Sequence, residues 1–408
     1  MINVIEGGVT AAKGYKASSA QAEIKYKNRD DMALVYSEVP AKIAGVFTTN
    51  VVKAAPVKWD MDLVKSEENA QAIVLNSGIA NACTSVEGDK ANLAMAKAIA
   101  DELGINERAV LTASTGVIGM QLPVDRLQNG AKLLVPALDS TIEAGTKAAK
   151  AIMTTDTVKK ECAVTFEIDG KTVTLGGMTK GSGMIHPNMA TMLCVFTTDL
   201  AISKELLQEA LSADVKKSFN MISVDRDTST NDTYVVFANG LAENKVITEK
   251  NGDYDAFCEA LAYVSTTLSK MMAADGEGAT KLFEAKVINA DTEENAAVLA
   301  KAVITSNLVK SAVFGNDANW GRIICALGYS GIQFNPEVVD LYIESDNGKL
   351  KLFENGLATD YSEEKATEIL SGKEVTATAD MKMGSCTATA WGCDLTYDYV
   401  KINGDYRS

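Results

Sequence analysis

Hydrophobic positions along this chain follow two periods that alternate from one end to the other. Residues 71–78, QAIVLNSG, and 109–115, AVLTAST, are short apolar runs bounded by polar residues, which predicts buried strands. The segment 90–103 between them has apolar residues at helical spacing and is followed by Gly104, which predicts a helix with a glycine cap. Two further helical stretches follow at roughly 124–138 and 139–152.

Two turns flanked by alternating apolar and polar positions predict β-hairpins. Residues 162–177 alternate on either side of Asp169-Gly170, and a second hairpin is predicted at Asn347-Gly348. Further helices are predicted near 203–219, 255–273 and 293–309, with strands at 232–240 and 281–290. This alternation of helices and strands predicts a mixed α/β fold rather than a repeat or an all-helical bundle.

The middle of the chain combines a glycine-rich segment with an apolar strand. Residues 176–189, GGMTKGSGMIHPNM, predict an exposed, bendable segment that leads into the β-prone run beginning at Ala190-Thr191. Such a junction can hold a strained peptide bond, which the Thr191 hydroxyl would attack at the Ala190 carbonyl. A freed Thr191 would carry its own α-amine, whose unperturbed pKa of about 7.7–8.0 suits a general base. We therefore consider an N-terminal threonine nucleophile beside the simpler interpretation, a buried strand that contains a threonine.

Composition and charge restrict the possible partners. The chain has 408 residues, of which 47% are apolar, enough for a large core in two or three lobes. Its formal net charge of −15 argues against nucleic acid as a partner, and an anionic substrate would need a local positive site. No segment approaches the roughly 18 uninterrupted apolar residues that span a bilayer, and no basic leader begins the chain, so we expect no membrane partner and a cytoplasmic location.

The metal-binding and nucleophilic side chains are few. Seven cysteines without a CxxC pair predict reduced thiols and no structural zinc site. The one histidine, His186, precedes a proline, and we interpret it as a loop residue. Because Thr191 would supply its own amine, the proposed chemistry requires neither a histidine nor a metal.

Five other residues are candidates for substrate chemistry. The turn STGVIG follows a predicted strand, and Gly116 would allow close backbone approach there, so that a backbone N–H and the hydroxyl of Thr115 could stabilise one oxyanion; a helix N-cap or an ordinary turn is the alternative. Lys180, together with Thr154 of MTTD, is a candidate for binding a carboxylate, against the alternative of a surface lysine.

Glu277 lies between two glycines and is a candidate for binding an ammonium group.

Residues 223–232 look at first like a calcium loop. They lack the glycine at the sixth position and the glutamate at the twelfth, so we expect a hydrogen-bonded turn there.

These segments together resemble the glutamate N-acetyltransferase, or ornithine acetyltransferase, family of arginine biosynthesis. The resemblance extends over nearly the whole chain and is most specific at KGSGMIHPNMATML. The other matching segments are AGVFTTN (44–50), VLNSGIANACT (74–84), STGVIG (114–119), MTTD (153–156), DTSTNDT (227–233), GEGATK (276–281), NDANWGRI (316–323), ATAWGCDLT (388–396) and INGDYRS (402–408).

The resemblance implies an αββα-type sandwich, similar to N-terminal-nucleophile hydrolases in mechanism. It also implies self-cleavage into an α chain, 1–190, and a β chain, 191–408, which assemble as an α2β2 heterotetramer. The implied reaction moves an acetyl group from N2-acetylornithine to glutamate through an ester on Thr191, with the oxyanion hole at Thr115 and Gly116. The implied substrate-binding residues are Thr154, Lys180, Thr191, Glu277, Asn403 and Ser408.

The chain departs from the family pattern at Ser85, Arg226 and Gly404, which stand where glycine, glycine and alanine are more usual. Several alternatives stay open: a self-processing amidase or aminopeptidase with the same nucleophile, an additional acetyl-CoA-dependent synthase activity, and a non-enzymatic binding protein. Acetyl-CoA would be a co-substrate, and no bound cofactor is expected.

Overall fold

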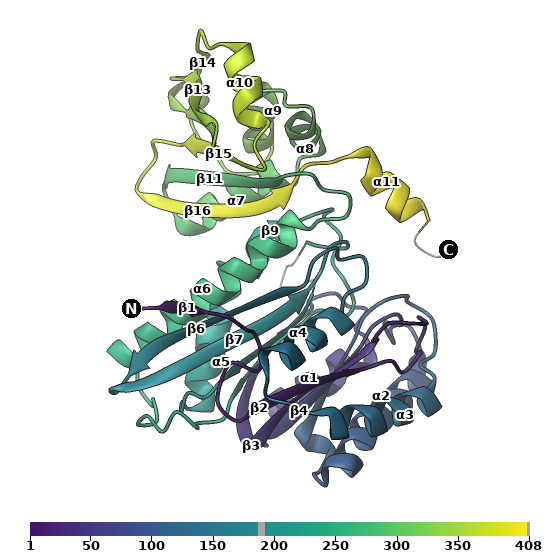
Figure 1. The fold of residues 1–408 in the computed structure, drawn as a ribbon. Coiled ribbons are helices and arrows are strands. Elements are labelled where there is room, and N and C mark those ends of the chain that lie inside the picture. Colours follow the sequence, from purple (N-terminus) through teal and green to yellow (C-terminus); the bar gives the residue numbers. More distant parts are fainter. Residues whose placement is uncertain (187–191, 406–408) are drawn as a thin grey trace. The chain divides into compact units, whose positions relative to one another are not determined.

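The computed structural model describes residues 1–186 and 192–405. Within this range the chain forms two compact units (Figure 1). Unit 1 contains residues 1–181, 192–220 and 228–268, and unit 2 contains residues 182–186, 221–227 and 269–405. Ala190, Thr191 and Ser408 lie outside the described residues.

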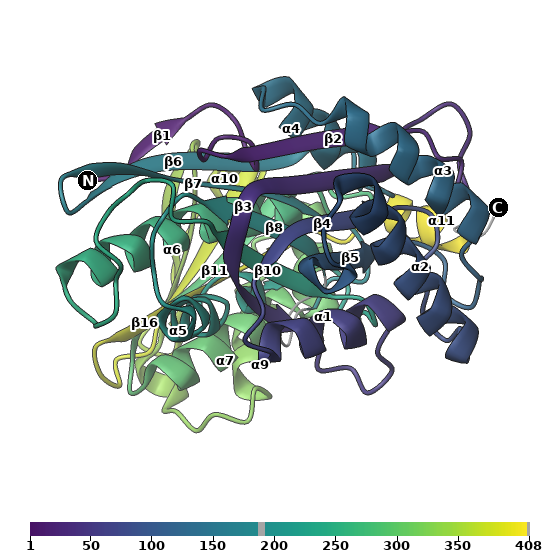
Figure 2. The ribbon, with the colours of Figure 1, turned by 90° about the horizontal axis from the view of Figure 1, so that it is seen from below.

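Unit 1 is organised around a nine-stranded sheet in the order β1-β6-β7-β8-β10-β3-β4-β5, with β2 paired to β3. Its strands are β1 (Asn3–Ile5), β2 (Tyr15–Ala20), β3 (Met32–Phe47), β4 (Ala70–Asn76), β5 (Val110–Ser114), β6 (Lys160–Ile168), β7 (Lys171–Lys180), β8 (Leu193–Thr198) and β10 (Thr233–Ala238). The long strand β3 joins two parts of the sheet, because its first half pairs with β2 and β4 and its second half with β10. Figure 2 shows that β3 is bent. Its pairing with β4 shifts register between Tyr36 and Ala41.

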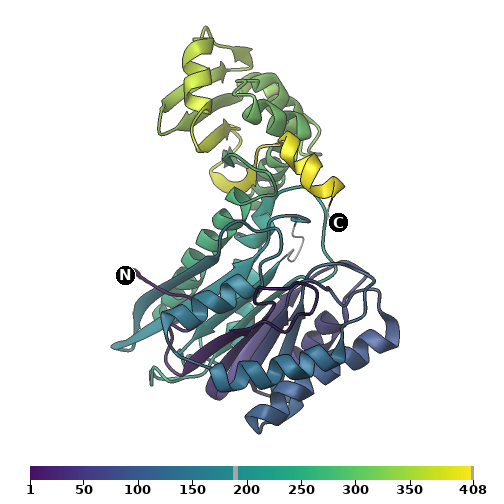
Figure 3. The same ribbon diagram turned by 45° about the vertical axis from the view of Figure 1, so that its right-hand side comes forward.

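Helices cover this sheet because their apolar faces pack on its strands. They are α1 (Ala55–Lys65), α2 (Ser85–Leu103), α3 (Val124–Leu134), α4 (Ile142–Ala151), α5 (Lys204–Asp214) and most of α6 (Gly252–Ala274). Helices α2 and α3 lie side by side (Figure 3), and Met95 and Leu127 enter one apolar cluster with Met32 and Val74 of the sheet. Gly104 ends α2 in the left-handed conformation, φ 70°, which confirms the predicted cap.

Unit 2 contains a seven-stranded sheet in the order β14-β13-β12-β15-β11-β16-β9. Its strands are β9 (Ile222–Ser223), β11 (Leu282–Ala290), β12 (Asp340–Ser345), β13 (Gly348–Glu354), β14 (Leu357–Ala358), β15 (Glu374–Asp380) and β16 (Cys386–Cys393). Its helices are α7 (Glu293–Ile304), α8 (Asn307–Phe314), α9 (Trp320–Gly328), α10 (Glu363–Leu370) and α11 (Tyr397–Gly404). Short 3-10 turns are η1 (Glu107–Ala109), η2 (Val135–Ala137), η3 (Phe219–Met221) and η4 (Pro336–Val338).

The mixed α/β class is confirmed, as are both hairpins. Asp169 and Gly170 have φ values of 51° and 71°, the left-handed pair that a type I′ hairpin turn requires. In the second hairpin the turn is Asp346-Asn347 rather than Asn347-Gly348, because Gly348 already pairs with Ser345 as the first residue of β13.

The segment 176–189 was predicted to be exposed, and for residues 176–182 this prediction is wrong. Residues up to Lys180 belong to β7 and are buried, and Ser182 is fully buried. The glycines serve close packing instead of flexibility: a Cβ on Gly176 would lie 2.0 Å from the carbonyl oxygen of Gly8, and one on Gly177 would lie 2.4 Å from the ring of Phe196. Close backbone contacts of this kind cannot be recognised from composition.

Among the described helices, none is by itself long and apolar enough to cross a membrane; α7 and α8 meet that criterion only as a pair, bent by 57°. The same part of the chain contains no group of three or more His, Cys, Asp or Glu residues arranged to hold a metal ion.

A buried carboxyl group in unit 1 makes stability depend on pH. Burial of Asp214 at the end of α5, partly offset by hydroxyl donors from Ser265 and Ser218, raises its pKa from 3.8 to about 6. The folded state therefore keeps this proton to higher pH than the unfolded chain, so the group's contribution to the free energy of unfolding falls as the pH rises through that window.

Replacing Asp214 by Asn should remove this dependence. Relative to the wild type, the Asp214→Asn variant should gain up to about 3 kcal/mol of unfolding free energy between pH 4 and pH 7, since one pKa unit corresponds to about 1.4 kcal/mol. Denaturant unfolding at both pH values measures it, and the exposed Asp255→Asn on α6 is the control. Equal pH dependence in Asp214→Asn and the wild type would contradict this assignment.

Candidate active site

The predicted oxyanion turn lies directly after β5. Ile79 forms β-bridges with both Thr115 and Val117, and the Thr115 N–H donates to the carbonyl of Asn76 at 3.0 Å. Gly116 has a φ of 130°, and a Cβ there would lie 2.2 Å from the carbonyl carbon of Gly78. Only glycine fits this position, as the sequence suggested, but the close approach is to the chain's own backbone.

Three polar side chains hold this turn in place. The Asn76 side chain donates to the Ile79 carbonyl at 2.9 Å and accepts from the Ser114 hydroxyl at 2.7 Å. Asn231 donates to the carbonyls of Ala80 and Ser114, at 2.6 and 2.8 Å. Neither Asn76 nor Asn231 is among the predicted site residues, although both belong to segments that carry the family resemblance. Buried amides that satisfy loop carbonyls in this way rigidify a turn.

Replacing Gly116 by Ala should therefore damage the turn. We expect Gly116→Ala to lower the unfolding free energy by at least about 2 kcal/mol and to reduce kcat, because the added methyl displaces the backbone around Gly78. Gly119→Ala is the matched control: Gly119 also has a positive φ, 85°, but a Cβ there meets nothing within 4 Å. Thermal unfolding of both variants measures the effect, and equal losses would show that backbone strain alone is responsible.

Lys180 lies beside this turn, and the alternative that it is a solvated surface lysine is wrong. It is the last residue of β7, is 8% exposed, and its Nζ lies 3.4 Å from the Thr115 hydroxyl. Two predicted site residues, separated by 65 positions in sequence, are thus brought together. They meet although β8, β10, β3 and β4 lie between β7 and β5 in the order of the sheet.

Asp156 connects Thr154, Lys160 and Lys180. It belongs to the motif MTTD, which by itself indicates no role for it. Its carboxylate accepts from the Lys160 ammonium at 2.7 Å, from the Gly181 N–H at 2.7 Å and from the Thr154 N–H at 3.1 Å, and it lies 4.0 Å from the Lys180 Nζ. Thr154 and Lys180, both predicted to bind substrate, are therefore anchored by one carboxylate.

Charge rather than exposure sets the ionisation of Asp156. Burial by itself would raise its pKa, but the ammonium groups of Lys180 and Lys160 outweigh burial and lower the pKa to about 2. Asp156 is therefore ionised at neutral pH. The three side chains, all at most 9% exposed, carry two positive charges and one negative charge, which favours an anion beside them.

Two further predicted residues meet in unit 2. The Asn403 side chain, on α11, donates to the Glu277 carboxylate at 2.7 Å, although the two are 126 positions apart. Glu277 is 6% exposed and packs against Gly183, where a Cβ would lie 2.2 Å from the carboxyl carbon. The Glu277 N–H donates to the Ser182 carbonyl at 2.9 Å, and the missing side chain of Gly183 leaves room for this carboxylate.

The only histidine lies outside helices and strands, as predicted. Burial, together with the positive charges of Lys301 and Arg226, lowers the pKa of His186 to about 4, so its ring is neutral at pH 7. Its Nδ1 lies 3.1 Å from the Ser223 hydroxyl. The turn predicted at 223–232 contains a hydrogen bond from the Asp227 N–H to the Asp225 carboxylate at 3.2 Å, and no calcium-type ligand set forms in the described residues.

Two departures from the family pattern have a common structural basis. Ser85 and Arg226 have φ values of 53° and 70°. Both lie in the left-handed region, where glycine is unstrained and a residue with a Cβ is not. The preference for glycine at these positions thus follows from backbone conformation.

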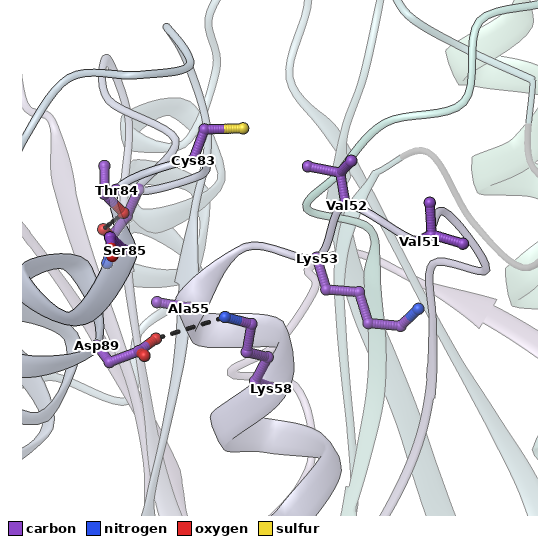
Figure 4. Close-up of a pocket in the computed structure, with 10 residues that line it drawn as sticks. Val51, Val52, Lys53, Ala55, Lys58, Cys83, Thr84, Ser85 and Asp89 are labelled. Atoms are coloured by element: carbon purple, nitrogen blue, oxygen red, sulfur yellow. Dashed lines mark hydrogen bonds and ion pairs between the residues drawn. The ribbon is translucent and has the colours of Figure 1, made fainter.

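Unit 1 also contains a separate cavity. It has a volume of about 200 Å³ between the segments that begin α1 and α2, with Val51, Val52 and Lys53 on one side and Cys83, Thr84 and Ser85 on the other (Figure 4). Lys58 pairs with Asp89 on its wall at 3.7 Å. The segment before α2 that lines this cavity also contacts the turn STGVIG, since the Gly119 N–H donates to the Ala82 carbonyl at 3.0 Å.

The predicted site residues therefore form two described groups. Thr115, Gly116, Thr154 and Lys180 lie together in unit 1, and Glu277 and Asn403 lie together in unit 2. The predicted nucleophile Thr191, its neighbour Ala190 and the C-terminal Ser408 fall outside the described residues.

Comparisons with known proteins place this arrangement in a family. The model of the ArgJ family matches residues 16–408. The arginine biosynthesis bifunctional protein ArgJ of Caldanaerobacter subterraneus subsp. tengcongensis is 52% identical over 407 residues, covering 100% of both chains. ArgJ 1 of Clostridium acetobutylicum is 52% identical over 98% of this chain and 97% of that protein.

A solved structure of the bifunctional protein argJ from Bacillus halodurans is 46% identical and covers 51% of this chain and 96% of that one, with a TM-score of 0.49. The family match includes both groups of site residues as well as the segment around Thr191. The chain therefore belongs to the ArgJ family.

Proposed function

We propose that this chain is an acyltransferase of arginine biosynthesis that moves the acetyl group of N2-acetylornithine to glutamate. Relatives of the same length that are 52% identical are named arginine biosynthesis bifunctional proteins, which supports this pathway. The observation in the site that carries the proposal is the buried ammonium of Lys180, 3.4 Å from the predicted oxyanion threonine. A carboxylate binder beside an oxyanion stabiliser suits an acylated amino acid.

The reaction proceeds in two half-reactions. The α-amine of Thr191 takes the proton of its own hydroxyl, and the oxygen attacks the acetyl carbonyl of N2-acetylornithine. Thr115 and Gly116 stabilise the oxyanion, and the Thr191 ammonium returns the proton to the departing amine of ornithine. The amine of glutamate then attacks the acetyl-Thr191 ester, which yields N-acetylglutamate and the free hydroxyl.

The positive charge beside Thr115 suits the group that both substrates share. N2-Acetylornithine and glutamate each carry an α-carboxylate, and Lys180 would bind it in both half-reactions, with Thr154 beside it. Glu277, whose carboxylate Asn403 orients, would interact with the side-chain ammonium of ornithine. Ser408 completes the proposed substrate-binding set.

The nucleophile must first be released. We infer that the chain cuts itself between Ala190 and Thr191 into an α chain, 1–190, and a β chain, 191–408, which remain together and form an α2β2 heterotetramer in the cytoplasm. The family membership supports this inference. The two chains that this cut produces do not correspond to the two compact units, because each unit contains residues from both sides of the cut.

A second activity is the other candidate. The relatives are called bifunctional, which supports use of acetyl-CoA as an alternative acetyl donor for glutamate. Acetyl-CoA would acylate the same threonine as a co-substrate, and the proposed reaction uses no bound cofactor.

Mass spectrometry of the purified protein, followed by an assay of ornithine release, tests the proposal. We expect two chains that begin at residues 1 and 191, and ornithine release that glutamate accelerates as N-acetylglutamate accumulates. Release of free acetate at a rate independent of glutamate would instead indicate a self-processing amidase. Formation of N-acetylglutamate with acetyl-CoA as the only donor measures the second activity.

A further inference from the structure

We propose that Lys160 is a positioning residue that neutralises Asp156, so that Lys160, Asp156 and Lys180 together keep one net positive charge for the carboxylate of the substrate. The inference rests on the proposed function, because it assumes that Lys180 binds this carboxylate. It adds Lys160 and Asp156, which contact no substrate in the proposed mechanism, to the residues that determine substrate affinity.

The contacts of Asp156 are unequal. One oxygen accepts from the Lys160 ammonium at 2.7 Å, whereas the other lies 4.0 Å from the Lys180 ammonium. The side chains of Asp156 and Lys160 are both 0% exposed and that of Lys180 is 9% exposed. Asp156 is thus in direct contact with Lys160 and at the outer limit of an ion pair with Lys180.

Because the group is buried, the difference between the Asp156–Lys160 and Asp156–Lys180 distances affects the charge that a substrate meets. In a site of low polarity, a carboxylate close to Lys180 attracts the ammonium and repels a second carboxylate more strongly than it would in water. With Lys160 in contact, Asp156 and Lys160 form a neutral pair, and the group keeps one net positive charge. This charge matches the single negative charge of an α-carboxylate.

The Asp156 carboxylate also has a structural role, which must be separated from the electrostatic one. It accepts backbone N–H groups from Gly181 at 2.7 Å and from Thr154 at 3.1 Å, which connects the KGSG and MTTD segments. If Lys160 only supported this connection, removing the charge of Asp156 in addition to Lys160 would raise KM further. If Lys160 neutralises charge, removing the charge of Asp156 as well should restore a low KM.

The test compares Lys160→Met with the double variant Lys160→Met/Asp156→Asn in the mature enzyme. In Lys160→Met, the group has no net charge, and we expect KM for N2-acetylornithine to rise about tenfold while kcat stays within about threefold. The double variant again has one net positive charge, and the amide oxygen that replaces a carboxylate oxygen can still accept the Gly181 N–H. Its KM should return to within about threefold of the wild type.

Lys159→Met is the matched control, because Lys159 precedes Lys160 and pairs with Glu161 instead, with its side chain 40% exposed. Its KM should not change. An unchanged KM in Lys160→Met, or a KM in the double variant as high as in the single variant, would overturn the inference. If Lys160→Met does not fold, the KM of the double variant is compared with that of the wild type alone. A KM within about threefold supports the inference, and a rise of about tenfold overturns it. A wild-type enzyme that releases no ornithine from N2-acetylornithine would count against the proposed function instead.

Discussion

Thr191→Ala should leave the chain uncut and should reduce acetyl transfer by at least about 10³-fold, the scale on which loss of a catalytic nucleophile acts. Both effects have one cause. In the proposed mechanism the same hydroxyl attacks the Ala190 carbonyl during cleavage and the acetyl carbonyl during catalysis, and alanine has no oxygen to form either ester. The purified variant should therefore give a single chain of 43.3 kDa.

Denaturing electrophoresis and the ornithine-release assay measure the two effects. Thr191→Ser is the informative companion, because it retains a hydroxyl and an α-amine and should still cut itself. Thr172→Ala serves as the control, since Thr172 is an exposed residue of β7 whose hydroxyl contacts Glu167. A Thr191→Ala protein that is fully active, whether cut or uncut, would refute the mechanism.

Lys180→Met should lower kcat/KM for N2-acetylornithine by about 30-fold to 1000-fold, the effect of removing one member of a buried charge pair. Methionine preserves much of the apolar stem but removes the charge that we propose binds the α-carboxylate. Stability should change less than activity, because Asp156 keeps its contact with Lys160 at 2.7 Å. The acceptor half-reaction should weaken as well, since glutamate carries the same carboxylate.

Lys171→Met is the control for this variant. Lys171 lies on the same strand, β7, but is exposed at its other end. Steady-state kinetics with each substrate varied in turn measure the effect. A Lys180→Met enzyme with unchanged KM for both substrates would show that the carboxylate binds elsewhere.

Local sequence patterns predicted the elements well because their causes are local. The periods of 2 and 3.6 residues follow from backbone geometry, and the turn at Asp169-Gly170 and the cap at Gly104 need only residues that tolerate a positive φ. The turn of the second hairpin was misplaced by one residue, since a glycine can also begin a strand, as Gly348 does. Such boundaries depend on which residue pairs across the sheet.

Motifs identified the candidate site residues but not their surroundings. The motif around MTTD pointed to Thr154, whereas Asp156, which connects Thr154 to Gly181, became apparent only in the folded chain. Asn76 and Asn231 were missed for the same reason. A side chain that positions another residue has no sequence signal of its own, because its function depends on where distant segments meet.

The sequence by itself determined the family and the type of many of the elements, and it named the candidate residues for the chemistry, because these depend on local periodicity and on motifs. Tertiary structure decided burial and pairing. It buried residues 176–182, with Gly176 against Gly8 and Gly177 against Phe196, and it brought Lys180 to Thr115 across 65 positions. Long-range contacts determine which charges lose water and which face one another, and these properties turn Lys180 from a lysine in a glycine-rich segment into a buried positive charge.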